Sequence, residues 1–259
     1  MTNQAKPLIL VTNDDGVTAP GIRNLIQWMN ILGEVVVVAP DSPQSGMGHA
    51  ITIHDTLRCN PTTQDAGPQT EYACSGTPVD CVKLAVHQIL DRKPDLVVSG
   101  INHGSNASVN VIYSGTMSAA VEGAMQRIPS IGFSLLDYSW DADFSAAKDH
   151  VLSIAKNVLA KGLPQGVCLN VNIPKVSDQP YAGIKVCRQT MGHWDEDFDA
   201  RVDPAGKPYY WMRGEFVDSD GGDDSDIWAL KHNYLSVVPI QFDLTAHHAL
   251  AAIHGILGA

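Results

Sequence analysis

Long hydrophobic runs are missing from this 259-residue sequence. The longest apolar stretches, such as 35–40, fall well short of the roughly 18 residues that a membrane-spanning helix requires. The early run 7–12 is too brief for the hydrophobic core of a secretory signal. We therefore expect a cytoplasmic protein that has no membrane partner.

Positive charge is also scarce. Lysine and arginine number 17 against 28 aspartates and glutamates, which gives a net charge of −11 at pH 7. This balance excludes a general binder of nucleic acid polymers, which needs a basic face. It is compatible with a small anionic substrate, because a bound divalent cation reverses the local charge. Apolar residues make up 44% of the chain and charged residues 17%, so a buried core is expected and disorder is excluded.

Cysteine is sparse and irregularly spaced. The sequence contains no Cys-x-x-Cys pair, and the number of cysteines is odd. This pattern predicts buried or idle thiols in a reducing compartment. The five residues are Cys59, Cys74, Cys81, Cys168 and Cys187.

Several common catalytic signatures are absent as well. The sequence lacks a P-loop, a Gly-x-Ser-x-Gly elbow, a His-Glu-x-x-His zinc motif and the dinucleotide fingerprint Gly-x-Gly-x-x-Gly. No cysteine is followed six positions later by arginine, which disfavours a cysteine phosphatase. Any chemistry must therefore come from a different set of residues.

What the sequence does contain is an alternation of buried strands and amphipathic helices. The pattern predicts a three-layer, Rossmann-like α/β fold, in which helices flank a mostly parallel sheet. A turn-rich excursion is expected at 51–73. Strands are predicted at 8–12, 35–39, 96–99, 130–136 and 167–173, and helices at 20–33, 77–89, 116–127 and 144–161. Residues 1–175 would form this catalytic core.

The character of the chain changes after about residue 174. Residues 181–212 read as mixed strand, 218–226 as an exposed acidic loop, 235–242 as a strand and 246–257 as a short helix. The stretch 183–231 is too thin to hold a core of its own. We expect the region 176–259 to be an arm for oligomerisation rather than an independent domain.

The polar loops that follow the predicted strands carry the candidate chemistry, because ligands of parallel sheets bind outside the carboxyl ends of the strands. Asp14 and Asp15 can converge where the first strand turns, and such a pair binds a hard cation. A simple aspartate turn is the competing interpretation, and it is the commoner one for an isolated Asp-Asp-Gly. The second loop offers the hydroxyl of Ser45 and the amide of Gly46, although a Ser/Gly loop of this kind is ordinary by itself.

The third loop and the helix after it add amide and hydroxyl groups. Asn102 and Asn106 can ligate a cation through oxygen or donate to a phosphate. Ser114, Gly115 and Thr116 open a helix, whose free N–H groups suit a phosphate, although capping alone would explain them. His103 is read as an incidental loop residue.

Together these segments resemble the SurE family of metal-dependent nucleotidases. The resemblance spans nearly the whole chain and is weakest between 189 and 226. It is carried by NDDGVTAPGI from Asn13, APDSPQSG from Ala39, SGTPVDCV from Ser75, PDLVVSGINHGSN from Pro94, VIYSGTMSAAVEGA from Val111, LNVNIP from Leu169 and DLTAH from Asp243.

The resemblance implies hydrolysis of nucleoside 5′- and 3′-monophosphates with one Mg²⁺ or Mn²⁺ per subunit, and cleavage of short polyphosphate in some members. It implies homodimers or homotetramers that exchange C-terminal segments. Because the position of His103 varies in the family, no role is carried over to it. The resemblance implies that the metal ligands are Asp14, Asp15, Ser45 and Asn102. It implies that the phosphate group is bound by Gly46, Asn106, Ser114, Gly115 and Thr116. The implied catalytic residues are Asp14, Asp15, Asn106 and Ser114.

Two rival functions compete with this hydrolase. A receiver-type signalling domain would also bind Mg²⁺ through paired aspartates, but it needs an acceptor aspartate after a later strand. The strand at 96–99 leads instead into Gly-Ile-Asn. A nucleotide-binding regulator without catalysis is the other alternative, and the complete ligand set disfavours it. The sequence leaves open the preferred base, the preferred phosphate position and the native metal.

Overall fold

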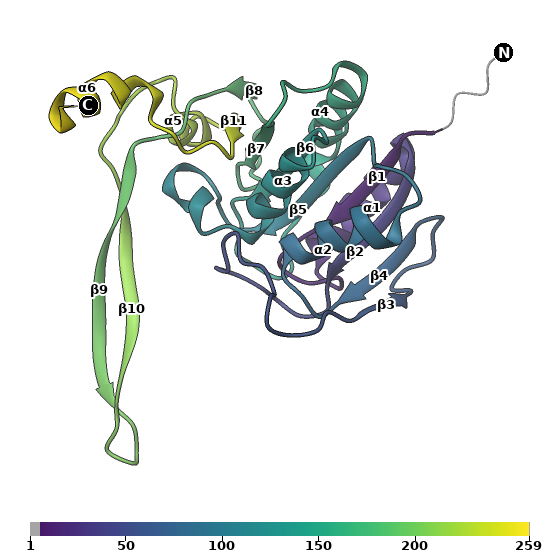
Figure 1. Ribbon diagram of the computed structural model, residues 1–259, viewed down its shortest axis with the longest axis horizontal. Coiled ribbons are helices and arrows are strands. Elements are labelled where there is room, and N and C mark those ends of the chain that lie inside the picture. The colour runs from purple at the N-terminus through teal and green to yellow at the C-terminus, as the bar shows by residue number, and fades with distance from the viewer. Residues whose placement is uncertain (1–5, 259) are drawn as a thin grey trace.

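The structure, a computed structural model, describes residues 6–258, and within them a nine-stranded sheet forms the centre of the molecule (Figure 1). The strand order is β3-β4-β2-β1-β5-β6-β7-β11-β8. The strands are β1 (Leu8–Thr12), β2 (Glu34–Pro40), β3 (Cys59–Thr62), β4 (Thr70–Cys74), β5 (Leu96–His103), β6 (Ser130–Leu135), β7 (Val167–Ile173), β8 (Gly183–Val186) and β11 (Tyr234–Gln241).

Pairing is parallel from β4 through β2, β1, β5 and β6 to β7. The antiparallel pairs are β3 with β4 and β11 with β7. The central strands are apolar runs buried on both faces, as expected for a parallel sheet covered by helices. The register sets Val11 beside Val37 and Thr12 beside Ser99, so the carboxyl ends of β2, β1 and β5 lie at one edge of the sheet.

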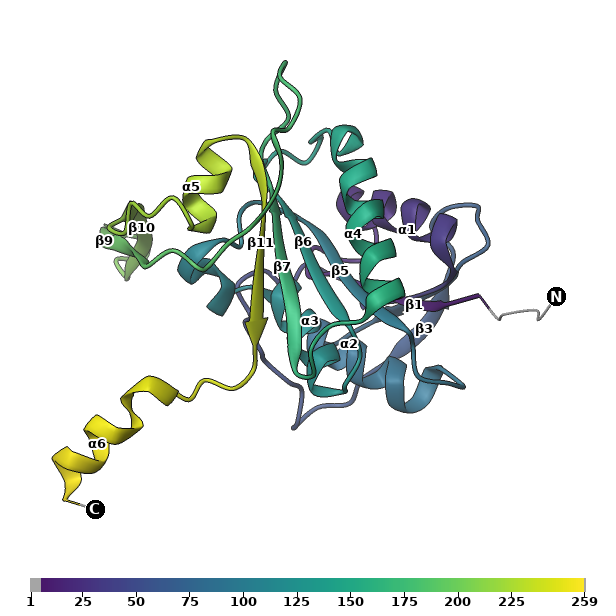
Figure 2. The same cartoon turned by 90° about the horizontal axis from the view of Figure 1, so that it is seen from above.

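Helices cover both faces of the sheet and give three layers (Figure 2). On one face, α1 (Pro20–Leu32) and α4 (Lys148–Lys161) bury Leu25, Met29 and Val151 against the strands. On the other, α2 (Pro78–Leu84) and α3 (Gly115–Met125) bury Val82 and Ala119. The fold class predicted from the alternation of strands and helices is confirmed.

Local capping explains where the helices begin. Pro20 lies in the first turn of α1, and Thr77 accepts from the backbone N–H of Asp80 in a capping box that starts α2. The helix predicted over 77–89 continues beyond α2 as a π-helical turn, η1 (Ala85–Ile89). The helix predicted from 144 begins in a short 3₁₀ turn, η3 (Ser145–Ala147).

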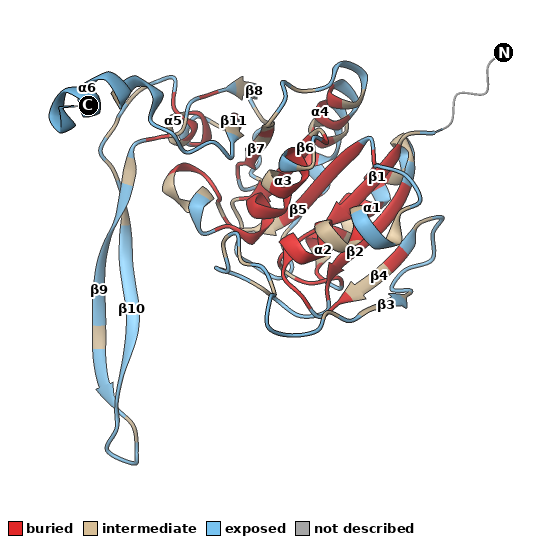
Figure 3. Cartoon of the chain, in the orientation of Figure 1, coloured by how far each residue is buried: buried red, intermediate tan, exposed pale blue. Residues whose placement is uncertain are grey.

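The C-terminal region departs from this layered body. A hairpin of β9 (Gly192–Val202) and β10 (Pro208–Asp218) extends far from the sheet, and its surface is almost entirely exposed (Figures 1 and 3). The chain then forms α5 (Asp226–Lys231), returns to the sheet as β11 and ends, after the 3₁₀ turn η4 (His247–Ala249), in α6 (Leu250–Leu257). Helix α5 was not predicted, and the loop expected to be exposed at 218–226 ends in two buried residues, Ser225 and Asp226.

The prediction of idle thiols is wrong for two of the cysteines. Cys59 and Cys74 are partners across β3 and β4 and form a disulfide. Spacing in the sequence missed this, because antiparallel pairing brings the two side chains together although they are 15 positions apart. Cys81, Cys168 and Cys187 are free and buried, as predicted. The disulfide removes the cysteine-based argument for a cytoplasmic location.

No helix within residues 6–258 combines the length and apolar character needed to cross a bilayer.

Candidate active site

Asp14 follows β1 and lies directly against the first turn of α3. It is 4% exposed, and the hydroxyl of Thr116 donates a hydrogen bond to its Oδ1. Gly115 allows this close approach, because a Cβ at that position would lie 2.7 Å from the Cβ of Asp14. The structure thus brings the first predicted carboxylate to the predicted phosphate-binding helix start.

The electrostatics of Asp14 are unusual for a carboxyl group. Burial raises its pKa from 3.8 to about 6, the charge of Asp15 contributes to the same rise, and the hydrogen bond from Thr116 opposes both effects. Asp15 Oδ2 accepts from the backbone N–H of His103 at 3.3 Å and lies 3.0 Å from His103 Nδ1. Among the described residues, no lysine or arginine forms an ion pair with either aspartate. The two carboxylates therefore create a negative site that a cation would stabilise.

Asn102 reaches the same edge from the end of β5, the strand next to β1. Its Nδ2 donates to the carbonyl oxygen of Gly104 at 3.0 Å. This hydrogen bond fixes the orientation of the amide and leaves Oδ1 available as an acceptor.

Ser45 and Gly46 lie in the exposed loop after β2. This loop is tied to the site on both sides, because the N–H of Gln44 donates to the carbonyl of Asp14 at 2.7 Å and the N–H of Gly48 donates to that of Tyr113 at 3.1 Å. Ser45 and Gly46 therefore lie between two residues that are hydrogen-bonded to the site, one to Asp14 and the other to Tyr113, which precedes Ser114.

These donors fit a hard divalent cation. Within residues 6–258 no cluster of three or more His, Cys, Asp or Glu side chains could hold an ion. A metal at this edge would depend on two carboxylates supplemented by amide and hydroxyl oxygens. An all-oxygen set of this kind suits Mg²⁺ or Mn²⁺ rather than a soft metal.

The start of α3 is arranged to accept an anion. The Oγ of Ser114 accepts from the N–H of Met117 at 3.0 Å, which leaves its own proton to donate. The N–H groups of Gly115 and Thr116 belong to the first turn, where no preceding helical carbonyl can accept from them. A hydroxyl and two amides therefore converge beside Asp14.

Asn106 belongs to a buried network of asparagines at the ends of β6 and β7. Its Nδ2 donates to Ser134 Oγ at 2.8 Å, and its backbone N–H and carbonyl bond to Asn172 and Asn170. Asn172 in turn donates to Asn170 at 2.9 Å. The network commits one of the two amide protons of Asn106 and fixes its position, and the second proton stays available.

His103 is more tightly packed than an incidental loop residue. Its ring stacks on Trp140 at 5.7 Å between ring centroids and meets Phe144 edge-on at 5.2 Å. Its Nδ1 faces Asp15, and its Nε2 is buried without a hydrogen-bond partner among the described residues. The sequence contained no periodic signal for this cluster, nor for Ser134, Asn170 and Asn172, because these residues meet only through the fold.

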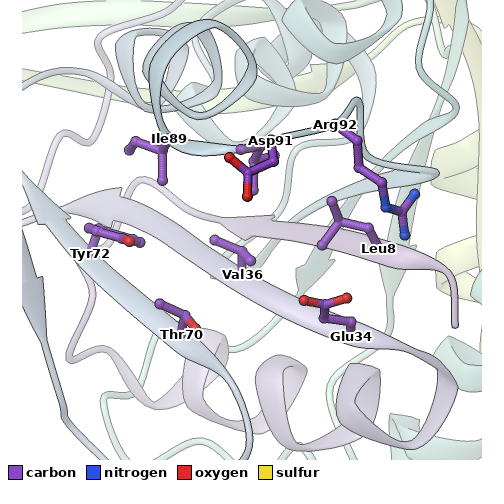
Figure 4. A pocket seen from close by; sticks show the side chains of 9 residues that line it. Leu8, Glu34, Val36, Thr70, Tyr72, Ile89, Asp91 and Arg92 are labelled. Carbon is purple, nitrogen blue, oxygen red and sulfur yellow. The ribbon is translucent and has the colours of Figure 1, made fainter. Parts of the chain in front are cut away.

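A hollow with a volume of about 320 Å³ lies at the opposite edge of the sheet (Figure 4). Leu8, Glu34 and Thr70, the first residues of three strands, line it together with Tyr72 and Arg92. It therefore sits at the amino ends of the strands, away from the aspartates.

The fold and the site define a doubly wound α/β protein whose polar residues gather at the carboxyl edge of the sheet, where this class of fold binds its ligands. The family profile described as Survival protein SurE matches residues 9–196. The chain belongs to the SurE family, which confirms the resemblance inferred from its motifs.

Individual relatives agree with this assignment. The chain is 63% identical to the 5′-nucleotidase SurE of Flavobacterium psychrophilum, over 96% of this chain and 97% of the relative. It is 64% identical to the 5′-nucleotidase SurE of Christiangramia forsetii, over 95% of each. The crystal structure of SurE protein from Aquifex aeolicus matches with a TM-score of 0.83 and 39% identity, covering 97% of this chain and 100% of that one.

Proposed function

We propose that this protein is a metal-dependent phosphomonoesterase that hydrolyses nucleoside 5′-monophosphates to nucleoside and phosphate. The observation that carries the proposal is the contact between buried Asp14 and the start of α3, with Asp15 alongside and no lysine or arginine in the described part of the chain paired to either. A dianionic phosphate can approach these carboxylates only together with a cation. The activity in the names of the relatives supports the same reaction.

In this proposal Asp14, Asp15, Ser45 and Asn102 hold one Mg²⁺ or Mn²⁺. When bound, such an ion polarises a phosphoryl oxygen and lowers the pKa of a coordinated water. Ionised Asp14 and Asp15 supply the charge that retains it, and the hydrogen bond from Thr116 holds Asp14 in place.

The remaining residues bind and stabilise the phosphoryl group. The hydroxyl of Ser114 and the N–H groups of Gly115 and Thr116 donate to its oxygens, and the amide of Gly46 and the second Nδ2 proton of Asn106 add further donors. Negative charge grows on these oxygens as the ester bond breaks, so fixed donors favour the transition state. Each is worth on the order of a hundredfold in rate.

The same donors contact phosphate and not the sugar. We therefore extend the proposal to 3′-monophosphates and to the terminal phosphate of short polyphosphate as secondary substrates. Protein stripped with a chelator, and assayed with Mg²⁺ or Mn²⁺ on nucleoside 5′- and 3′-monophosphates and polyphosphate, tests all three reactions.

The decisive variant is Asp15→Ala, with Asp41→Ala as its control. Asp41 is an exposed aspartate in the loop after β2, and its side chain accepts only from neighbouring Ser42 among the described residues. Asp15→Ala should lower metal-dependent turnover by at least about a hundredfold while the protein still folds. Asp41→Ala should retain it. A fully active Asp15→Ala variant would remove the carboxylate pair from the mechanism.

The receiver-type alternative gains nothing from the structure, since β5 ends in Gly100, Ile101, Asn102 and His103 without an acceptor carboxylate. Incubation with acetyl phosphate separates the two functions. Stable labelling of the protein would favour a receiver, and release of phosphate favours the hydrolase.

We also propose that residues 176–259, which add β8 and β11 to the central sheet, assemble two or four copies of the chain. Helix α6 is rich in apolar side chains and exposed along its whole length, and an isolated helix of this composition normally packs against a partner. Deletion of 246–259 should shift the mass measured by light scattering towards the monomer. An unchanged mass would exclude α6 from the interface.

A further inference from the structure

A cavity of about 440 Å³ opens beside the start of α3, between the base of the hairpin and the turn η2 (Ser108–Ile112). Tyr113 lines it and directly precedes Ser114, the first residue of the proposed phosphate site, in the chain. The other lining residues are Asn110, Trp194, Glu196, Met212, Arg213 and Gly214.

Trp194 forms a fixed aromatic wall of this cavity. Its Nε1 donates to Asn110 Oδ1 at 2.8 Å, and its ring meets Phe216 edge-on at 5.9 Å between centroids. The indole is nevertheless 37% exposed. A ring held at its nitrogen and against Phe216, with part of its surface still accessible, is preorganised for stacking.

The Trp194 ring lies close to the backbone of the opposite strand at Gly214. Gly214 pairs with Glu196, and a Cβ at Gly214 would lie 3.5 Å from Trp194 Cε3. Tyr113, 55% exposed, supplies a second aromatic group, and its backbone is held by hydrogen bonds to Asn110 and Gly48. The cavity of about 440 Å³ is therefore lined by two partly exposed aromatic side chains.

Polar groups complete the lining. The carboxylate of Glu196 can only accept from an exocyclic amino group or ring N–H, and the guanidinium of Arg213 can only donate to a ring nitrogen or carbonyl oxygen. Aromatic surface with an acceptor and a donor matches a heterocycle that stacks and carries hydrogen-bonding groups at its edge. The larger ring of a purine stacks more strongly than that of a pyrimidine.

We infer that this cavity binds the purine base of the nucleotide, with Trp194 as the specificity-determining residue. The inference rests on the proposed function, because the phosphate must lie at Ser114 for a ribose to bridge to Trp194. It predicts faster turnover of purine than of pyrimidine monophosphates.

The test compares substrates with and without a base. The ratio of kcat/KM for AMP or GMP to that for ribose 5-phosphate should fall about tenfold in Trp194→Ala, mainly through KM, because stacking on an aromatic side chain contributes this much. Trp194→Phe should restore most of the ratio. Trp211→Ala is the matched control, since Trp211 lies on the same hairpin, is exposed and does not line the cavity. An unchanged ratio in Trp194→Ala would overturn the inference.

Direct binding separates failure of this inference from failure of the proposed function. Adenosine and guanosine, which lack phosphate, should quench tryptophan fluorescence in the intact protein and quench it less in Trp194→Phe. If no phosphate ester is hydrolysed but nucleosides still bind in this way, the base site stands and the hydrolase proposal fails. If the esters are hydrolysed but the nucleosides do not bind, the base site is wrong. A Trp194→Ala variant whose mass changes while its substrate ratio does not would assign the cavity to a second copy of the chain.

Discussion

Replacing Asp14 with asparagine should stabilise the metal-free protein at pH 8 while abolishing its activity. Burial and the charge of Asp15 raise the pKa of Asp14 from 3.8 to about 6, so the folded state carries an unfavourable charge whenever Asp14 is ionised. The difference between 3.8 and about 6 corresponds to about 3 kcal/mol, at 1.36 kcal/mol for each pH unit. The asparagine side chain would keep an oxygen that can accept from Thr116, and it removes the charge.

The sign of the pH dependence follows from linkage. Well below pH 3.8 Asp14 is protonated in both the folded and the unfolded protein, so the substitution should change the free energy of unfolding little. Between 3.8 and about 6 the folded state retains a proton that the unfolded state has lost, and the wild type becomes progressively less stable with rising pH. Above about pH 6 the full difference applies, which raises the melting temperature of Asp14→Asn by roughly 6–12 °C.

Denaturant unfolding of both proteins at pH 4 and pH 8, in the presence of chelator, measures this difference. Asp41→Asn, in an exposed loop, is the control and should stay within about 0.5 kcal/mol of the wild type. Mn²⁺ at a hundred times its dissociation constant should then raise the free energy of unfolding of the wild type by about 2.7 kcal/mol and leave that of Asp14→Asn unchanged. The reasoning would be refuted if the two proteins were equally stable at pH 8. It would also be refuted if Asp14→Asn exceeded the wild type in stability by the same amount at pH 4 as at pH 8.

Three further experiments probe the site and the fold. Ser114→Ala should cost about 1 kcal/mol of stability because the cap of α3 is lost, whereas Ser114→Gly should cost only a few tenths of a kcal/mol. Both variants should lower kcat/KM, measured with AMP, because both lack the hydroxyl. His103→Leu should weaken Mn²⁺ binding about tenfold by electron paramagnetic resonance titration, and His103→Asn, which keeps a donor towards Asp15, should weaken it less. Alkylation in denaturant without reductant should modify three cysteines by mass spectrometry and, after reduction, all five; five without reduction would mean that Cys59 and Cys74 are not bridged.

Local sequence signals were sufficient for most of the layered body. The run at 8–12 became β1 with the same bounds, because a continuous apolar segment of that length is satisfied only between two layers of helix. The Thr77-Pro78 start of α2 was equally clear, since its capping box involves residues three positions apart. The aspartate loop could be placed at the edge of the sheet because it directly follows a recognisable strand.

Contacts between distant parts of the chain were beyond such signals. Asn106 bonds to Asn172 across 66 positions, and the backbone N–H of Ser108 bonds to Asp226 across 118. Only the folded sheet brings these residues together. The short helix α5 was missed because its buried Asp226 and neighbouring Ser225 read as part of an acidic loop. The ligand and phosphate roles of the candidate residues stay predictions.

The long hairpin offers a place to attach a probe. Its turn, residues 203–207, is closed by hydrogen bonds between Asp203 and Lys207 and lies at the far end of the ribbon (Figure 1). Eight residue-to-residue steps of extended strand, roughly 27 Å, separate Val202 from Trp194. A fluorophore or affinity tag inserted after Ala205 would thus lie far along the ribbon from Trp194 and would follow, in the chain, every residue of the proposed catalytic site.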